Sequence, residues 1–207
     1  MTQKGYKMES LIISMVVFAF AGAATPGPVN IVAAASGAQF GVKKALVYVV
    51  GASVSYAVVV LLCGLTIGSI LLSVPEFSFY LKVAGSLFLL YLAYQIASSS
   101  PVALQQTSAK TDPPGFGKGA MTQGLNPKAW LYASSGISLF VAGTNSANLY
   151  LTLLVTISLV VCFVGVATWA VFGQAIGRWL NSCKRQRMFN VLMGLLLAIT
   201  VAGMWWE

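Results

Sequence analysis

Two long apolar segments of the chain are each interrupted by a proline motif, Thr25-Pro26-Gly27-Pro28 in the first half and Asn126-Pro127-Lys128 in the second. Proline has no backbone N–H and its ring clashes with the preceding turn, so it interrupts helical hydrogen bonding. In lipid the carbonyl groups freed in this way need another partner, which restricts such breaks to places that face protein or a cavity. Breaks at matching places in two halves of a membrane protein indicate a transport site near the bilayer midplane.

The composition indicates a membrane protein. Of the 207 residues, 58% are hydrophobic and 8% are charged, whereas soluble domains carry about 25% charged residues. The chain has no histidine, which excludes His-based metal sites and Ser-His-Asp or Cys-His nucleophiles. We therefore expect neither a metal nor a cofactor. The three cysteines are too scattered for a disulfide framework, and we expect them to have packing roles.

The net charge of +8 does not indicate nucleic-acid binding, because the basic residues stand between apolar segments rather than on one polar face. We interpret them as topology signals next to a lipid bilayer. Most lie in three loops, which hold Lys43, Lys44, Lys110, Lys118, Arg178, Lys184, Arg185 and Arg187. The positive-inside tendency places these loops in the cytoplasm and both termini outside. Lys4 and Lys7, near the N-terminus, argue for the opposite orientation.

Six segments are long and apolar enough to cross a bilayer, which takes about 20 residues. They cover approximately residues 11–37, 45–74, 77–97, 119–142, 149–177 and 188–206. A polar, proline-rich connector over residues 99–117 separates the half at 1–98 from the half at 118–207. The turn-forming composition of residues 143–148 divides a long uncharged stretch into two spans. We predict an all-α membrane protein of six transmembrane helices, with the first and fourth broken at the proline motifs.

The two halves share a weak internal repeat at a shift of 99 residues. The shift matches Pro28 with Pro127, Ala34 with Ala133, Ser36 with Ser135, and Gly37 with Gly136. Small residues are common in membrane helices, so chance agreement is the alternative to a true repeat. If the repeat is real, three spans per half force the halves into opposite orientations, which gives two inverted three-helix repeats. Such a pair has two equivalent packings that open a central site to each side in turn.

Polar side chains gather at the two breaks within otherwise apolar spans. An ionisable residue there costs about 2.5 to 3.5 kcal/mol on insertion scales, which makes Lys128 a functional candidate. No acidic residue inside a span is placed to neutralise it, so the carboxylate of an amino acid would be a natural partner. The alternative is that Lys128 lies near the end of its span and extends to the lipid headgroups.

The first break offers acceptors for the other end of a zwitterion. Freed backbone carbonyls, the Thr25 hydroxyl and Asn30 could accept hydrogen bonds from a substrate ammonium, and Gly27 allows close backbone approach. Helices that restart after Pro28 and Pro127 would present N-terminal N–H groups to a carboxylate. The predicted substrate site comprises Thr25, Pro26, Gly27, Pro28, Asn30, Gln123, Asn126, Pro127 and Lys128. No span contains a histidine or a well-placed carboxylate to carry protons, which leaves Lys128 as the alternative carrier.

These motifs resemble the lysine-exporter superfamily, which includes the homoserine and threonine efflux proteins. The resemblance covers nearly the whole chain and rests on residues 25–28, Gly41, Gly51, 85–93 and 124–128. It implies a multi-pass protein of the bacterial inner membrane that exports amino acids, is driven by the proton gradient and is often dimeric. Residues 91–97 are similar to members that export cysteine and O-acetylserine. Ser55 and Phe88 depart from the glycine and tyrosine usual in relatives.

We therefore expect a secondary exporter of small neutral amino acids or close derivatives, such as cysteine, O-acetylserine, threonine or homoserine. A non-transporting membrane scaffold, whose broken helices only shape an interface, is the alternative. An intramembrane enzyme is the weakest interpretation, because no span contains paired carboxylates, histidine or a cluster of metal ligands. Paired breaks favour transport, since an interface alone does not require them.

Overall fold

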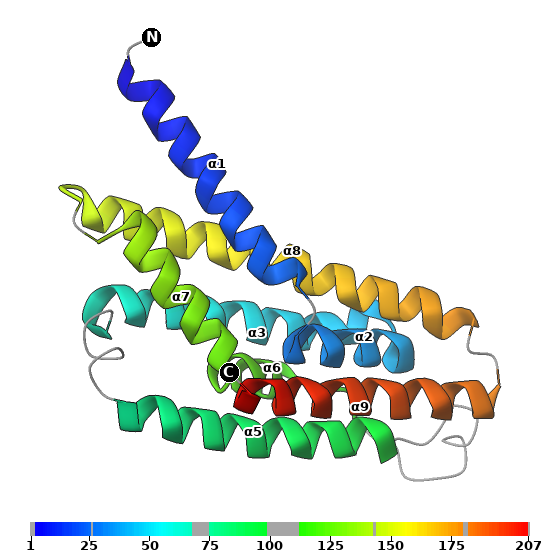
Figure 1. Ribbon diagram of the computed structural model, residues 1–207. Helices are drawn as coiled ribbons and strands as arrows, with labels where there is room; N and C mark the ends of the chain where they lie inside the picture. Colours follow the sequence, from blue (N-terminus) through cyan, green and yellow to red (C-terminus); the bar gives the residue numbers. More distant parts are fainter. Residues whose placement is uncertain are drawn as a thin grey trace.

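The computed structural model describes residues 3–25, 27–67, 75–98, 112–142, 144–179 and 182–206, and every regular element in these ranges is a helix (Figure 1). The first half contains α1 (Gln3–Ala24), α2 (Pro28–Phe40), α3 (Val42–Leu62), the π-helix η1 (Cys63–Ile67) and α5 (Pro75–Ser98). The second half contains α6 (Phe116–Gly124), α7 (Pro127–Phe140), α8 (Ala147–Trp179) and α9 (Cys183–Trp206). The predicted all-helical fold is confirmed for these residues.

Both proline motifs break a helix, as the sequence predicts. The axes of α1 and α2 differ by 62° across the first break, and the second break separates α6 from α7. Pro28 and Pro127 each lie in the first turn of the helix that follows, where a missing N–H leaves no intrahelical bond unmade. The shift of 99 residues therefore relates positions with the same local structure.

Length and apolarity identify three membrane-crossing helices within the described residues, and a fourth if the bent pair α1–α2 forms one span. The three are Val42–Leu65, Ala147–Gly177 and Cys183–Gly203, while α5 supplies a shorter apolar helix, Ser86–Ser98. The helices fall on the six predicted segments, but six complete spans are not established. The pair α6–α7 does not qualify, and its segment carries Lys118 and Lys128. Residues 68–74 and 99–111, which end the second predicted span and form most of the connector, lie outside the described ranges.

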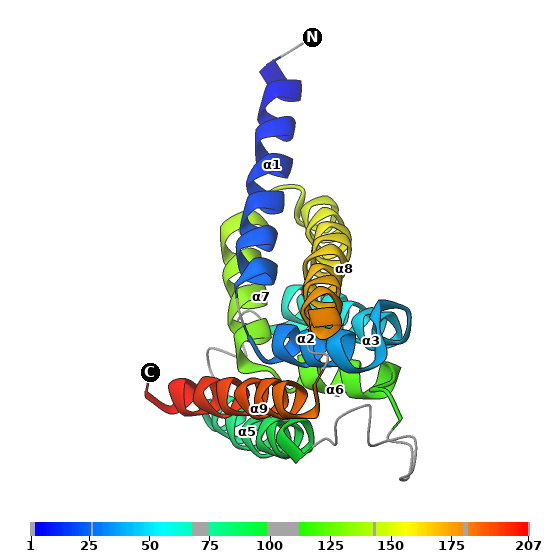
Figure 2. The same cartoon turned by 90° about the vertical axis from the view of Figure 1, so that its right-hand side faces the viewer.

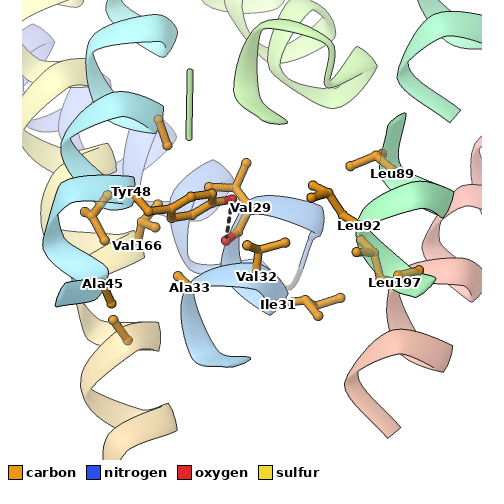
Figure 3. Close-up of a cluster of buried hydrophobic side chains, with 14 of the residues drawn as sticks. Val29, Ile31, Val32, Ala33, Ala45, Tyr48, Leu89, Leu92, Val166 and Leu197 are labelled. Carbon is orange, nitrogen blue, oxygen red and sulfur yellow. Dashed lines mark hydrogen bonds between the residues drawn. The ribbon is translucent and has the colours of Figure 1, made fainter. Parts of the chain in front are cut away.

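The short helix α2 lies at the centre of the bundle, with α3 and α8 on one side and α5 and α9 on the other (Figures 1 and 2). Residues 28–37 are all buried. Figure 3 shows Val29, Ile31 and Val32 of α2 between Tyr48 of α3 and Leu92 of α5. The Tyr48 hydroxyl donates a hydrogen bond to the carbonyl oxygen of Val29 at 3.4 Å. Because α2 is surrounded by protein, its buried residues lie all around the helix rather than along one face.

Glycine and alanine let α2 approach α8 until their backbones touch. A Cβ atom placed on Gly37 would collide with the carbonyl oxygen of Ala170, and one placed on Gly173 would collide with that of Ala34. In lipid such small residues favour helix association, because close backbone approach gains packing contacts that large side chains would prevent. Side chains at these two glycines are therefore incompatible with the observed spacing of the helices.

If α1, α2, α3 and α5 of the first half are taken as equivalent, in that order, to α6, α7, α8 and α9 of the second half, most contacts between helices have an equivalent contact. Helix α3 packs on α6 as α8 packs on α1, and α2 packs on α8 as α7 packs on α3. Helix α2 also packs on α9 as α7 packs on α5, while α3 meets α8 and α5 meets α9. Two related halves that exchange contacts across a common interface would produce this pattern. The matching is unequal in extent, since α2 is much more enclosed than α7.

Candidate functional site

A small cavity of about 40 Å³ lies where the two helix breaks meet. Its wall comprises Gly22, Ala23, Thr25, Gly27, Val29, Asn30, Tyr56, Gln123, Asn126, Lys128, Ala129, Tyr132, Cys162 and Val166. Six of the nine residues predicted for the substrate site are among them. Pro28 and Pro127 do not line the cavity but begin α2 and α7 beside it, and Pro26 lies outside the described residues. We call this space the central cavity.

The first break is closed by side chains that satisfy freed backbone carbonyls. Asn30, in the first turn of α2, donates from Nδ2 to the carbonyl oxygens of Ala23 at 2.9 Å and Thr25 at 3.0 Å. The Thr25 hydroxyl donates to the carbonyl oxygen of Ala21 at 2.5 Å. The sequence suggested these groups as acceptors for a substrate ammonium. In this structure both act as donors that stabilise the bend.

The second break is organised by Asn126, which caps α7. Its Oδ1 accepts a hydrogen bond from the backbone N–H of Lys128 at 3.2 Å, as is typical of an N-cap residue. Its Nδ2 donates to Gln123 Oε1 at 3.4 Å, which ties the cap to the end of α6. The indole N–H of Trp130 donates to the carbonyl oxygen of Gly124 at 2.8 Å. Side chains on both sides of the break therefore hold α6 and α7 together in this arrangement.

Lys128 connects the two breaks. Its Nζ donates to the carbonyl oxygen of Thr25 at 3.3 Å, across 103 positions of sequence. The same ammonium lies 5.6 Å from the centre of the Tyr132 ring, within the range of a cation–π contact. The side chain is half-buried, and no acidic residue is among the described residues that line the cavity. The Lys128 ammonium thus points toward the first break. This is not the orientation of a lysine that extends outward to the lipid headgroups.

Sequence reasoning missed several residues of the central cavity. Tyr132 follows Lys128 by one helical turn on α7, so the spacing of helix positions could have identified it. Cys162 of α8 lines the cavity, although the sequence assigned it only a packing role. Tyr56 comes from α3, and no pattern in the sequence connects it to the proline motifs. Such residues join the site only through the packing of distant helices.

Apolar helices that enclose polar side chains at two paired breaks define a multi-pass membrane protein. The chain belongs to the LysE type translocator family, whose sequence model matches residues 20–203. This confirms the family resemblance drawn from the motifs. The family is one of transporters rather than of enzymes.

Proteins named cysteine/O-acetylserine efflux protein are among its relatives. The one from Klebsiella pneumoniae is 28% identical over 191 residues, covering 91% of this chain and 93% of the relative. The one from Salmonella typhimurium is 31% identical over 176 residues, covering 84% and 87% of the two chains. The one from Escherichia coli O1:K1 is 29% identical over 178 residues, covering 84% and 87%. No solved structure matches the chain.

Proposed function

We propose that this protein is a secondary active exporter of small neutral amino acids in the cytoplasmic membrane of a bacterium. The observation that carries the proposal is the contact between the two breaks, where the Lys128 ammonium lies in the central cavity with a backbone carbonyl as its partner. A half-buried cation with no acidic residue among the described residues around it provides a site for an external carboxylate. The helix breaks supply polar groups for the rest of a zwitterion.

Recognition would proceed by an exchange of hydrogen bonds. The Lys128 ammonium, which now donates to the Thr25 carbonyl oxygen, would turn to the substrate carboxylate, since hydrogen bonds between charged groups are stronger. The Thr25 carbonyl would then accept from the substrate ammonium. Helix α2 has no side-chain cap on its first N–H groups, so its N-terminus adds donors beside the carboxylate. Each charged end of the substrate thus replaces a contact present in the empty protein.

The central cavity would have to enlarge to hold a substrate. Its volume of about 40 Å³ is well below the roughly 300 to 1,000 Å³ of most ligand pockets. Helix α7 supplies Lys128, Ala129 and Tyr132 to the wall and is less enclosed than α2. We propose that α7 moves outward during loading. The matched helix contacts of the two halves support an inverted repeat, which would let a central site alternate between the two sides of the membrane.

The relatives support a small neutral substrate. Their printed names refer to efflux of cysteine and O-acetylserine, both of which are zwitterions without a charged side chain. The cavity is small, and its wall contains the bulky Tyr56 and Tyr132 beside the small Gly22, Ala23, Gly27 and Ala129, which favours a substrate with a short side chain. We propose cysteine and O-acetylserine as first substrates, with threonine and homoserine next, and the proton gradient as the energy source.

Efflux from proteoliposomes tests the proposal. Purified protein would be reconstituted with labelled cysteine, O-acetylserine, threonine, homoserine, leucine or lysine inside, and release would be followed with and without a pH gradient. We expect faster release of the small neutral amino acids and a dependence on the gradient. Release without such a dependence would remove proton coupling. If none of the amino acids moves, the scaffold interpretation replaces the exporter.

A further inference from the structure

A second, larger cavity lies at the opposite end of α2 from the helix break. It has a volume of about 470 Å³ and is formed by α2, α5, the residues that precede α6, and the first turn of α6. Among the described residues, its wall contains Val32, Ala35, Ser36, Gln39, Phe40, Leu92, Tyr94, Gln95, Ile96, Ser98, Asp112, Pro114 and Lys118. This volume falls within the range of small-molecule sites. We call it the outer cavity.

Two polar groups of α2 at the outer cavity have no hydrogen-bond partner. The Ser36 hydroxyl oxygen and the Gln39 Nε2 atom are both inaccessible to solvent and unpaired, and Ser36 as a whole is 3% exposed. A buried polar group without a partner costs about 1 to 3 kcal/mol. Two of them, one turn apart on the same helix, indicate that something polar completes their bonding. A hydroxyl and an amide together can both donate and accept.

The outer cavity also contains one group of each charge. Lys118 donates from Nζ to Gln95 Oε1 at 3.0 Å, and this neutral amide leaves its charge uncompensated. No ion pair within 4.0 Å joins Asp112 to Lys118 in the described part of the chain. A carboxylate and an ammonium that line one cavity without meeting are complementary to a ligand with both charges. A fatty or aromatic ligand would leave the polar groups of Ser36 and Gln39 without partners and would compensate neither charge.

We infer that the outer cavity binds a free amino acid as a zwitterion, with its carboxylate toward Lys118 and its ammonium toward Asp112. Ser36 and Gln39, whose polar atoms are closed off from the cavity in this structure, would be uncovered by loading and would bond to the remaining polar atoms of the ligand. This inference rests on the proposed export function and adds to it a second, loading site. The basic residues at this end of α2 indicate the cytoplasmic side, so the outer cavity would take the substrate before the central cavity does.

Helix α2 connects the two cavities. Asn30 lines the central cavity, and Val32, Ala35 and Ser36, up to two turns further along, line the outer one. Between them lies the buried cluster of Figure 3, where Val32 and Leu92 occur together. A substrate that passes from one site to the other would have to part this apolar contact. The cluster therefore acts as a barrier between two polar sites.

Protection of single cysteines from a small charged thiol reagent tests the inference. Two full-length chains, both with Cys63, Cys162 and Cys183 replaced by alanine, would carry Ser36→Cys in the outer cavity or Thr25→Cys at the central one. Serine serves as the probe because it has no thiol, and N-acetylserine, which lacks the ammonium, serves as its control. Ser135→Cys, the exposed equivalent of Ser36 on α7, reports any general effect of serine.

We expect serine at about ten times its Kd to slow modification of Ser36→Cys about tenfold. N-acetylserine should give no protection, and adding Lys118→Gln or Asp112→Asn should abolish the effect of serine. Gln39→Cys provides a second reporter if Ser36→Cys does not fold. Modification that ignores serine, or no modification of either reporter, overturns the inference. Protection by anionic lipid but not by serine also overturns it.

Failure of the export function would look different. In that case Thr25→Cys would not be protected, and proteoliposomes would release no amino acid. If Thr25→Cys is protected and efflux proceeds while Ser36→Cys reacts freely in serine, the central site stands and the outer site does not. The two reporters therefore separate the loading site from the function on which it rests.

Discussion

The two restarting helices, α2 and α7, hold the same place in the two halves but differ in their surroundings. Each begins with a proline after a helix break. Residues 28–37 of α2 are all buried, whereas the buried residues of α7 are only Ala129, Ala133, Gly136 and Ile137. Figure 2 shows α2 inside the bundle and α7 at its side. One break is thus built into the core and the other into a more exposed wall.

The contacts made by equivalent glycines show the difference in detail. A Cβ on Gly37 of α2 would collide with the backbone of Ala170. A Cβ on Gly136 of α7 would lie 3.1 Å from Phe18 Cε1 and 3.4 Å from Leu154 Cδ2. Side chains can turn aside, but a helix backbone cannot. The comparison shows that α2 is held by close backbone contacts and α7 by side chains, so we expect α7 to yield more easily than α2.

Matched alanine substitutions at these two glycines should give the largest difference in stability. Gly37→Ala forces α2 and α8 apart, and overpacking of this kind costs about 1 to 3 kcal/mol or more. Gly136→Ala should cost less than about 1 kcal/mol, because two side chains can adjust. Thermal unfolding of the purified variants in detergent compares them. Equal stability of the two variants would contradict the conclusion that α2 is packed more closely than α7.

Removing the charge of Lys128 tests the contact between the breaks. Lys128→Gln should reduce efflux about tenfold to a hundredfold, because a hydrogen bond to a charged group contributes about 1.5 to 3 kcal/mol. Lys44→Gln, an exposed lysine at the start of α3, is the matched control and should transport normally. The measurement is the initial rate of efflux from proteoliposomes. Unchanged transport by Lys128→Gln would remove its role as partner of the substrate carboxylate.

The caps of the two helices predict a smaller effect. Asn126→Ala removes the side chain that caps α7, and loss of such a cap costs about 1 kcal/mol. Gly27→Ala at the start of α2 should cost less than Asn126→Ala, because it removes no side-chain cap, Gly27 is extended with φ −166°, and the nearest atom to a new Cβ is Lys128 Nζ at 3.6 Å. Denaturation midpoints of the two variants provide the comparison. A larger loss of stability for Gly27→Ala than for Asn126→Ala would contradict this comparison of the two helix N-termini.

The smallest effect is expected at the serines related by the internal repeat. Ser36→Ala removes a hydroxyl that has no partner in the protein, so stability should change by less than about 0.5 kcal/mol or even rise. Ser135→Ala on the exposed face of α7 should also stay within about 0.5 kcal/mol. Unfolding without added amino acid measures both. A clear loss for Ser36→Ala would show that its hydroxyl is bonded within the protein.

The sequence predicted the two breaks because proline has a fixed steric effect, and it placed both at the correct residues. It also identified Lys128 and Asn126, since polar groups are conspicuous in apolar segments. It did not predict that Thr25 and Asn30 would serve as donors to backbone carbonyls, because that depends on the bend between α1 and α2. The outer cavity was missed altogether. Ser36 looks like any small residue of a membrane helix until its neighbours are known.

The hydrogen bond from Lys128 to Thr25 has a consequence for when the protein would act. An empty transporter already has its cation occupied, so a substrate must compete with an internal partner and needs a higher concentration to bind. A cell would therefore keep its amino acids at ordinary levels and lose them only in excess. The same contact closes the gap between the two halves, which would limit leakage of ions through the resting protein. An exporter built in this way would release amino acids only when they accumulate in the cell.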